Sequence, residues 1–89
     1  MNTRRIIYRG RVQGVGFRFR TKNVANNYRV CGYVKNLDDG TVELIAQGTG
    51  AEIRRFLAGV DTEMGRLITG SRSSDVDAPP VFDTFDIAY

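Results

Sequence analysis

The stretch of this sequence best suited to chemistry is Gly10–Arg18, which lies between a predicted strand and a predicted helix. Its glycines at positions 10, 14 and 16 allow the backbone to turn sharply and to approach a ligand closely. A helix that begins near Gly16 directs its unpaired N–H groups and the positive end of its dipole into this turn. With Arg18 just inside the helix, the stretch predicts a cradle for an anion, most naturally a phosphate.

The basic side chains gather in the part of the chain that contains this loop. Residues 1–37 hold nine of the thirteen basic side chains and no acidic one, whereas the remainder holds four basic and all ten acidic side chains. This asymmetry favours an anionic partner, either a nucleic acid or a small phosphorylated molecule. The alternative is a cluster of surface charge that serves solubility alone.

The residue types that are missing limit the chemistry. The chain has no histidine, which excludes histidine bases, histidine metal sites and histidine-dependent triads. Its single cysteine, Cys31, can form neither an internal disulfide nor a thiolate metal cluster, and we expect a packed or inert thiol there rather than a nucleophile. We therefore expect no metal and no cofactor. Catalysis has to rely on arginine, amide, carboxylate, lysine or hydroxyl side chains and on backbone N–H groups.

Length and composition predict one domain that spans residues 1–89. An apolar fraction of 42% and a charged fraction of 26% are typical of a soluble globular protein. No apolar run approaches the ~20 residues of a membrane span, and the first residues lack the apolar core of a signal peptide. With a single cysteine, we expect a monomer in the reducing cytoplasm, with no membrane partner.

Hydrophobic periodicity predicts the elements that have to position the loop. The first half gives strand, helix, strand and strand over residues 4–12, 17–29, 30–36 and 41–47. In the last of these, Ile45 is the odd apolar residue on the outward face. A capping box, Thr49 with Glu52, then begins a second helix that ends near residues 59–61. The remaining sequence predicts a short strand at residues 66–70, a loop at residues 71–80 and a terminal edge strand at residues 82–89.

This order, β-α-β-β-α-β with an added edge strand, predicts a ferredoxin-like α/β sandwich with two helices on one face of a mostly antiparallel sheet. Its four-strand core runs 4-1-3-2, so the first two strands are parallel and end at the same edge. Two strand spacings, roughly 10 Å, separate their ends. We therefore expect Gly14, Arg18 and Asn36 to converge.

At these residues the chain resembles the acylphosphatase family. The family's motif Gly-Arg-Val-Gln-Gly-Val-x-Phe-Arg is complete at Gly10–Arg18. Its second motif matches Gly32–Asn36 with Gly40 and Val42 at the family spacing, and Gly48 and the ending Phe85–Tyr89 also fit. The resemblance covers nearly the whole chain and is weakest at residues 61–81. The sequence departs from the family at Gly65–Gly70, where the family usually shows a stronger fourth strand.

The resemblance implies hydrolysis of the carboxyl–phosphate bond of acyl phosphates, with a small-molecule acyl phosphate as the substrate. It implies that Asn36 orients the attacking water and that Arg18 binds the phosphate together with the backbone amides of Gln13, Gly14, Val15, Gly16 and Phe17. Local sequence alone favours a plain turn residue at Asn36. A departing carboxylate, with a pKa of about 4, needs no proton from the enzyme, so a chain without histidine suffices. We expect direct attack by water, without a metal or a covalent intermediate.

Three other functions are compatible with parts of the sequence. An RNA-recognition sheet shares the strand order, but the outward positions of the first and third strands hold no aromatic side chain for base stacking, so we expect no nucleic acid partner. A P-loop nucleotide site is excluded, because no Gly-Lys-Ser/Thr follows the turn. A non-catalytic, phosphate-binding module of the same family remains the alternative.

Overall fold

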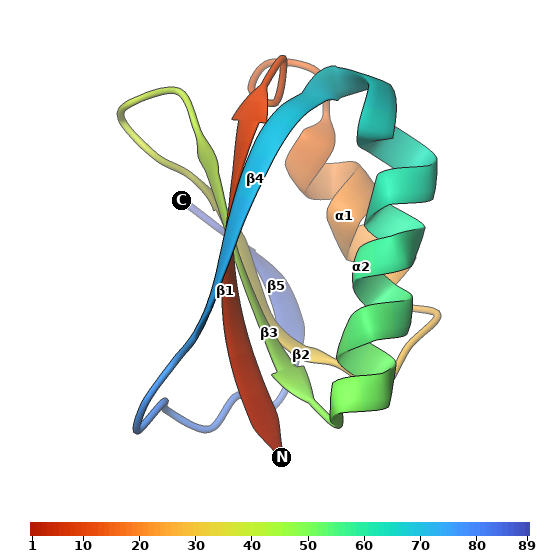
Figure 1. Ribbon diagram of the computed structural model, residues 1–89, viewed down its shortest axis with the longest axis vertical. Helices are drawn as coiled ribbons and strands as arrows, with labels where there is room; N and C mark the ends of the chain where they lie inside the picture. Colours follow the sequence, from red (N-terminus) through yellow and green to blue (C-terminus); the bar gives the residue numbers. More distant parts are fainter.

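A computed structural model describes residues 1–89 as one five-stranded sheet with both helices on a single face (Figure 1). In chain order the elements are β1 (Asn2–Gly10), α1 (Phe17–Ala25), β2 (Cys31–Asn36), β3 (Val42–Gly48), α2 (Gly50–Met64), the 3-10 turn η1 (Gly65–Leu67), β4 (Ile68–Asp75) and β5 (Phe85–Ala88). This confirms the predicted ferredoxin-like α/β sandwich with its added edge strand. No helix has both the length and the apolar character needed to cross a membrane.

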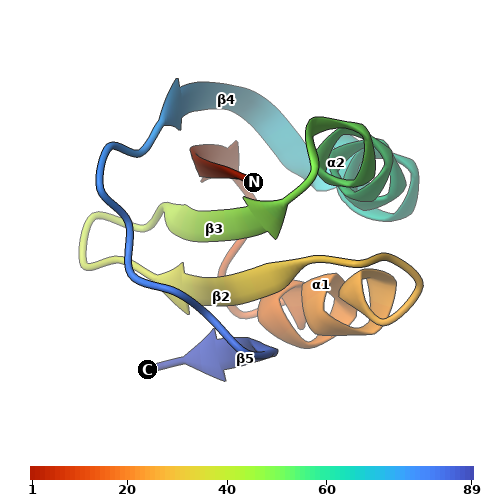
Figure 2. The same cartoon turned by 90° about the horizontal axis from the view of Figure 1, so that it is seen from below.

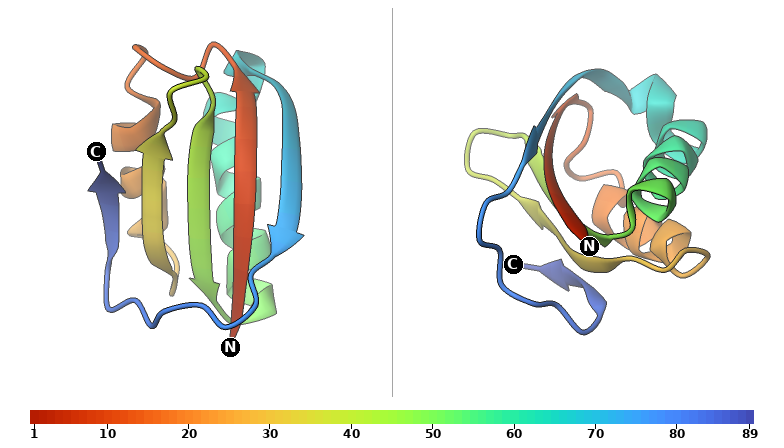
Figure 3. Two further views of the ribbon diagram at one scale, coloured as in Figure 1. Left: turned by 90° about the vertical axis from the view of Figure 1, so that its left-hand side faces the viewer. Right: turned by 60° about the horizontal axis from the view of Figure 1, so that its bottom comes forward.

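The strand order is β4-β1-β3-β2-β5, which confirms the predicted four-strand core (Figure 3). β1 and β2 each pair antiparallel with β3 and therefore run in the same direction. β5 adds to the free edge of β2 in the parallel sense. β5 is therefore the edge strand on this side of the sheet. The sequence pattern alone did not define its direction.

The register of the strands brings three strand ends to one edge of the sheet. Val42 pairs with Tyr8 on one side and with Asn36 on the other. The ends of β1 and β2 therefore lie two strand spacings apart, roughly 10 Å. Ala88 pairs with Lys35, so β5 ends beside Asn36 at the same edge.

The helices begin as their sequences predict but end differently. The Thr49 side chain accepts a hydrogen bond from the Glu52 N–H at 3.2 Å, which confirms the capping box of α2. α2 continues one turn beyond the predicted end, because Met64 extends its buried stripe. α1 ends at Ala25 rather than near residue 29. There the Asn27 side chain hydrogen-bonds to backbone carbonyls of the last turn, which competes with helix continuation.

The prediction of a loop at residues 71–80 is wrong in its first half. β4 continues to Asp75 and pairs with β1 from Arg4↔Asp75 to Gly10↔Ile68. Its residues from Ser71 onward are exposed, because β4 is an edge strand held by its backbone ladder and by side-chain bonds such as Arg4 to Ser73 at 3.1 Å. Hydrophobic periodicity does not detect a strand of this kind.

The sheet face opposite the helices is partly covered. Residues 76–84 cross it on the way from β4 to β5 (Figure 2). The Gln47 amide donates to the Pro80 carbonyl at 2.9 Å, and the Phe82 ring packs edge-on against Tyr33 with 6.0 Å between centroids. Ile45, the odd outward residue of the prediction, pairs with Tyr33 and is buried on this face.

Candidate active site

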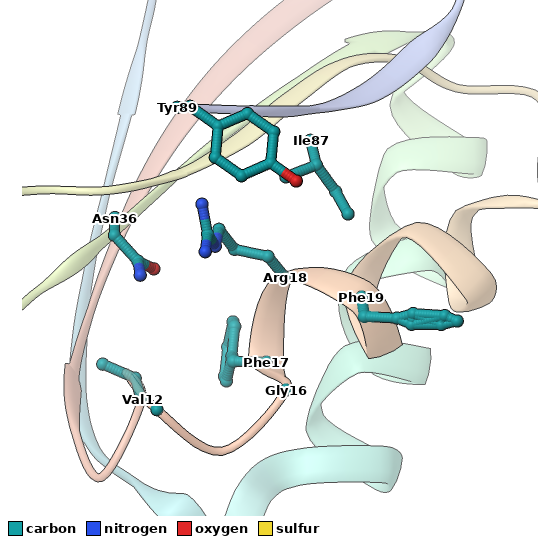
Figure 4. A pocket seen from close by; sticks show the side chains of 9 residues that line it. Val12, Gly16, Phe17, Arg18, Phe19, Asn36, Ile87 and Tyr89 are labelled. Carbon is teal, nitrogen blue, oxygen red and sulfur yellow. The ribbon is translucent and has the colours of Figure 1, made fainter.

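A pocket opens at the sheet edge where β1, β2 and β5 end (Figure 4). It is lined by the glycine loop, the start of α1, the end of β2 and the end of β5. The lining residues are Val12, Gly14, Gly16, Phe17, Arg18, Phe19, Asn36, Ile87 and Tyr89. No aspartate or glutamate is among them, so the fixed positive charge of Arg18 has no acidic neighbour in the lining.

Two glycines of the loop, Gly14 and Gly16, line the pocket. Gly14 and Gly16 have φ angles of 75° and 77°, a left-handed conformation that glycine adopts without strain. Gly16 precedes the first residue of α1, where no side chain caps the helix and the first turn holds no acidic residue. The first N–H groups of α1 are therefore without side-chain partners and favour an anion.

Arg18 is an unusual arginine in this chain. Every other arginine is either exposed or part of an ion pair, whereas Arg18 is half-buried and pairs with no carboxylate. Its Nη1 donates to the Ala88 carbonyl at 3.3 Å, and its Cζ lies 4.8 Å from the centroid of the Tyr89 ring. Figure 4 shows the guanidinium extending from α1 toward Tyr89 and Asn36. Most of its five N–H donors remain available to a ligand.

Asn36 contributes a side-chain oxygen without a partner. Its Oδ1 is one of two buried side-chain polar atoms in the chain with no hydrogen-bond partner, the other being Thr21 Oγ1. Leaving such an acceptor unsatisfied costs about 1–3 kcal/mol. A donor at this position, such as a bound water, would satisfy it.

The structure brings together five of the predicted site residues around one pocket: Gly14, Gly16, Phe17, Arg18 and Asn36. Phe17 anchors the start of α1, because its buried ring packs on Tyr8 with 5.5 Å between centroids.

The other two predicted residues, Gln13 and Val15, are not among the lining residues. The Gln13 side chain bonds to backbone carbonyls of the β2–β3 turn, and Val15 packs against the core. The phosphate role expected at these two positions could only involve their backbone.

Four lining residues were not expected from the sequence: Val12, Phe19, Ile87 and Tyr89. In the sequence, Phe85, Ile87 and Tyr89 alternate with other residues, which is typical of one face of a strand. This alternation does not specify the parallel pairing of β5 with β2, which carries Tyr89 to the edge of the sheet where Asn36 lies. The Phe19 ring is exposed and extends away from Arg18, so it contributes only to the rim (Figure 4).

The titratable groups with shifted pKa values lie outside the lining. Burial raises the pKa of Tyr8, which packs behind Phe17. On the opposite face of the sheet, burial and a hydrogen bond to Glu43 raise the pKa of Tyr33 to about 12. The pocket therefore combines one arginine, one carboxamide and free backbone donors, a set that suits a phosphate and a neutral nucleophile.

Comparison with known proteins agrees with this geometry. The family model described as Acylphosphatase matches residues 4–87. An acylphosphatase of Staphylococcus aureus (strain Newman) is 57% identical over 51 residues, which cover 57% of this chain and 56% of that protein. The match thus spans little more than half the length of these curated relatives.

Two solved structures have the same fold over the whole chain. The crystal structure of acylphosphatase from Bacillus subtilis has a TM-score of 0.88 and 33% identity, and the match covers 100% of both chains. HypF of T. kodakarensis has a TM-score of 0.86 and 26% identity, and the match covers 100% of this chain but 12% of that one. The chain belongs to the acylphosphatase family.

Proposed function

We propose that this protein is an acylphosphatase, which hydrolyses the carboxyl–phosphate bond of a small acyl phosphate to a carboxylate and inorganic phosphate. One observation carries the proposal: an arginine without an ion pair lines the same pocket as an asparagine whose side-chain oxygen has no hydrogen bond. The first suits a phosphoryl group and the second suits a water. The membership of the family and the relatives named acylphosphatase support the same reaction.

The phosphoryl group is bound by Arg18 and by the loop. The planar guanidinium offers paired donors that match two phosphate oxygens. The N–H groups between Gly14 and Arg18, at the start of α1, add donors and the positive end of the helix dipole. These groups also stabilise the charge that spreads over the equatorial oxygens during phosphoryl transfer.

The attacking water is held by Asn36. Its Oδ1 accepts a hydrogen bond from the water and thereby points the water's lone pair at phosphorus. The water oxygen bonds to phosphorus, the bond from phosphorus to the acyl oxygen breaks, and the carboxylate departs with the bonding electron pair. The proton released by the water passes to the phosphate product or to solvent. A carboxylate leaves without protonation, so neither a general acid nor a metal is required.

Hydrolysis of benzoyl phosphate in the presence of a chelator tests the proposal. We expect activity in the parent protein and a loss of about 100-fold or more in kcat/KM for Arg18→Ala, because a charged donor that contacts the transferred group is removed. Arg20→Ala is the matched control, since Arg20 lies on the same helix, is exposed and has no ion pair. A folded parent that binds phosphate through Arg18 but does not hydrolyse the substrate would instead be a non-catalytic phosphate-binding module.

We propose that residues 1–89 act as one domain and as a monomer, which size-exclusion chromatography checks. The single cysteine, Cys31, favours a reducing compartment such as the cytoplasm.

A further inference from the structure

We infer that Gln13 is a positioning residue that holds Asn36 in register with the phosphate-binding loop. This inference rests on the proposed function for its catalytic consequence and on the hydrogen bonds of Gln13 for its structural one. Gln13 lies in the loop, one residue before Gly14, yet it is not among the residues that line the pocket. Its side chain therefore has a role other than contact with the substrate.

The Gln13 carboxamide joins the two segments that carry the site. Its Nε2 donates to the Leu37 carbonyl at 2.8 Å and to the Thr41 carbonyl at 2.8 Å. Leu37 directly follows Asn36, so the loop that presents the phosphate donors is tied to the residue after the water-binding side chain. No other hydrogen bond joins loop residues 11–16 to residues 36–42.

The two acceptors define the base of the β2–β3 turn. The Leu37 N–H donates to the Thr41 carbonyl at 2.9 Å, and the Gly40 N–H donates to the Leu37 carbonyl at 3.2 Å. The Gln13 side chain thus donates a hydrogen bond to each of the two carbonyls that also accept the backbone hydrogen bonds of this turn. The Asp39 carboxylate stiffens the turn from within, because it accepts from the Thr41 N–H at 3.0 Å and from the Thr41 hydroxyl at 2.6 Å.

In the proposed reaction, two separate segments of the chain hold the two reacting groups. The loop and Arg18 hold the phosphoryl group, and Asn36 holds the water. In-line attack requires both to be placed together, and a misplacement of about 1 Å can cost up to about 100-fold in rate. Asn36 Oδ1 accepts no hydrogen bond that would fix the side chain. The backbone next to Asn36 therefore sets its position.

Gln13→Met tests this inference, because methionine keeps the length of the side chain and removes its donor. We expect kcat for benzoyl phosphate to fall between about 10- and 100-fold, while inhibition by inorganic phosphate stays within about twofold, since the loop amides and Arg18 are retained. A loss of phosphate affinity that matches the loss of kcat would make Gln13 a phosphate ligand and overturn the inference.

A double-mutant cycle separates positioning from general damage. In an Asn36→Ala background, Gln13→Met should change kcat by less than about twofold, because the group that it positions is gone. An equal fold-loss in both backgrounds would show that Gln13 acts elsewhere.

The chain offers a matched control in its only other glutamine. Gln47 is buried, and its carboxamide bonds to the Thr3 hydroxyl, the Pro80 carbonyl and the Phe82 N–H at 2.9–3.0 Å, outside the site. Gln47→Met should lower the free energy of unfolding but leave kcat within about twofold of the parent.

Amide hydrogen exchange gives a readout that does not depend on activity. In Gln13→Met we expect the Leu37 and Gly40 amides to exchange about fivefold faster, and in Gln47→Met at the parent rate. If the parent does not hydrolyse acyl phosphates, the proposed function fails, and faster exchange still supports the hydrogen-bonded link between loop and turn. Unchanged exchange in Gln13→Met would overturn the inference, whatever the activity.

Discussion

The guanidinium of Arg18 lies over the ring of Tyr89, with 4.8 Å between Cζ and the ring centroid. Tyr89 lies on the side of the guanidinium that faces away from the glycine loop (Figure 4). The contact thereby holds the charged group in the pocket. The neighbouring Ala88 carbonyl accepts from the same side chain at 3.3 Å. β5 and the residue that follows it therefore contribute to the pocket, although neither contains a residue that the sequence led us to expect there.

Removal of the Tyr89 ring should weaken substrate binding with only a small loss of stability. A cation–π contact at an exposed site contributes about 0.5–1 kcal/mol, so Tyr89→Ala should raise KM for an acyl phosphate about two- to fivefold. Tyr89 is 90% exposed, so the midpoint of thermal unfolding should fall only slightly. Steady-state kinetics checks this, with Tyr89→Phe as the control that keeps the ring. Equal KM values for Tyr89→Ala and the parent would show that the contact does not position Arg18.

Replacing Gly14 by a residue with a side chain should impair both stability and phosphate binding. A Cβ there would meet no atom within 4 Å, so the penalty is the left-handed φ of 75°, roughly 1–2 kcal/mol for a non-glycine residue. Gly14→Ala should lower the free energy of unfolding by that amount, and also weaken phosphate binding because the loop amides shift. Gly40→Ala calibrates the strain, since Gly40 has a φ of 90° and equally open space. Urea unfolding and phosphate titration measure the two effects, and full phosphate affinity in Gly14→Ala would contradict the loop's role.

A cluster on the opposite sheet face should make stability depend on acid. Arg5 Nε lies 2.6 Å from Glu43 Oε2, and the Tyr33 hydroxyl donates to Glu43 Oε1 at 2.7 Å. Burial raises the pKa of Glu43, but the hydrogen bonds from Arg5 and Tyr33 outweigh it and hold the pKa below the ordinary 4.5. As the pH falls, Glu43 therefore binds a proton in the unfolded chain before it does so in the folded protein. The stability that Glu43 contributes is present above pH 4.5 and is lost as the pH falls below it.

Glu43→Gln removes this titration. At neutral pH the variant should be about 1 kcal/mol less stable, because the partly exposed ion pair is lost. Between neutral pH and pH values below 4.5 it should lose less stability than the parent. Urea unfolding at both pH values measures the difference, and Glu63→Gln, an exposed carboxylate without an ion pair, is the control. If Glu43→Gln and the parent lost the same free energy of unfolding between the two pH values, Glu43 would not be the group responsible for the acid dependence.

The fold was predictable where local signals and topology agreed. The capping box at Thr49, the glycine loop before Phe17 and the β2–β3 turn each define a boundary through local chemistry. Once the helices and strands were in order, the strand arrangement placed the ends of β1 and β2 at one edge. The convergence of Arg18 and Asn36 on one pocket followed from that topology.

The parts that were missed depend on contacts between distant segments. β4 beyond Ser71 is polar and exposed, and only its ladder with β1 makes it a strand. Ile45 is buried on the sheet face that residues 76–84 cross, and alternation within its own strand does not predict a covering segment there. Tyr89 reaches the site only through the parallel pairing of β5 with β2, and alternation within a strand does not specify its neighbour.

The most direct test of the account compares Asn36→Ala with the parent in one assay of benzoyl phosphate hydrolysis, with inorganic phosphate as a competitive inhibitor and a chelator present. The account predicts that the parent is active, and that the folded variant binds phosphate like the parent but turns over at least about 100-fold more slowly. A variant that retains the parent's kcat, or a folded, phosphate-binding parent with no hydrolysis, would contradict it.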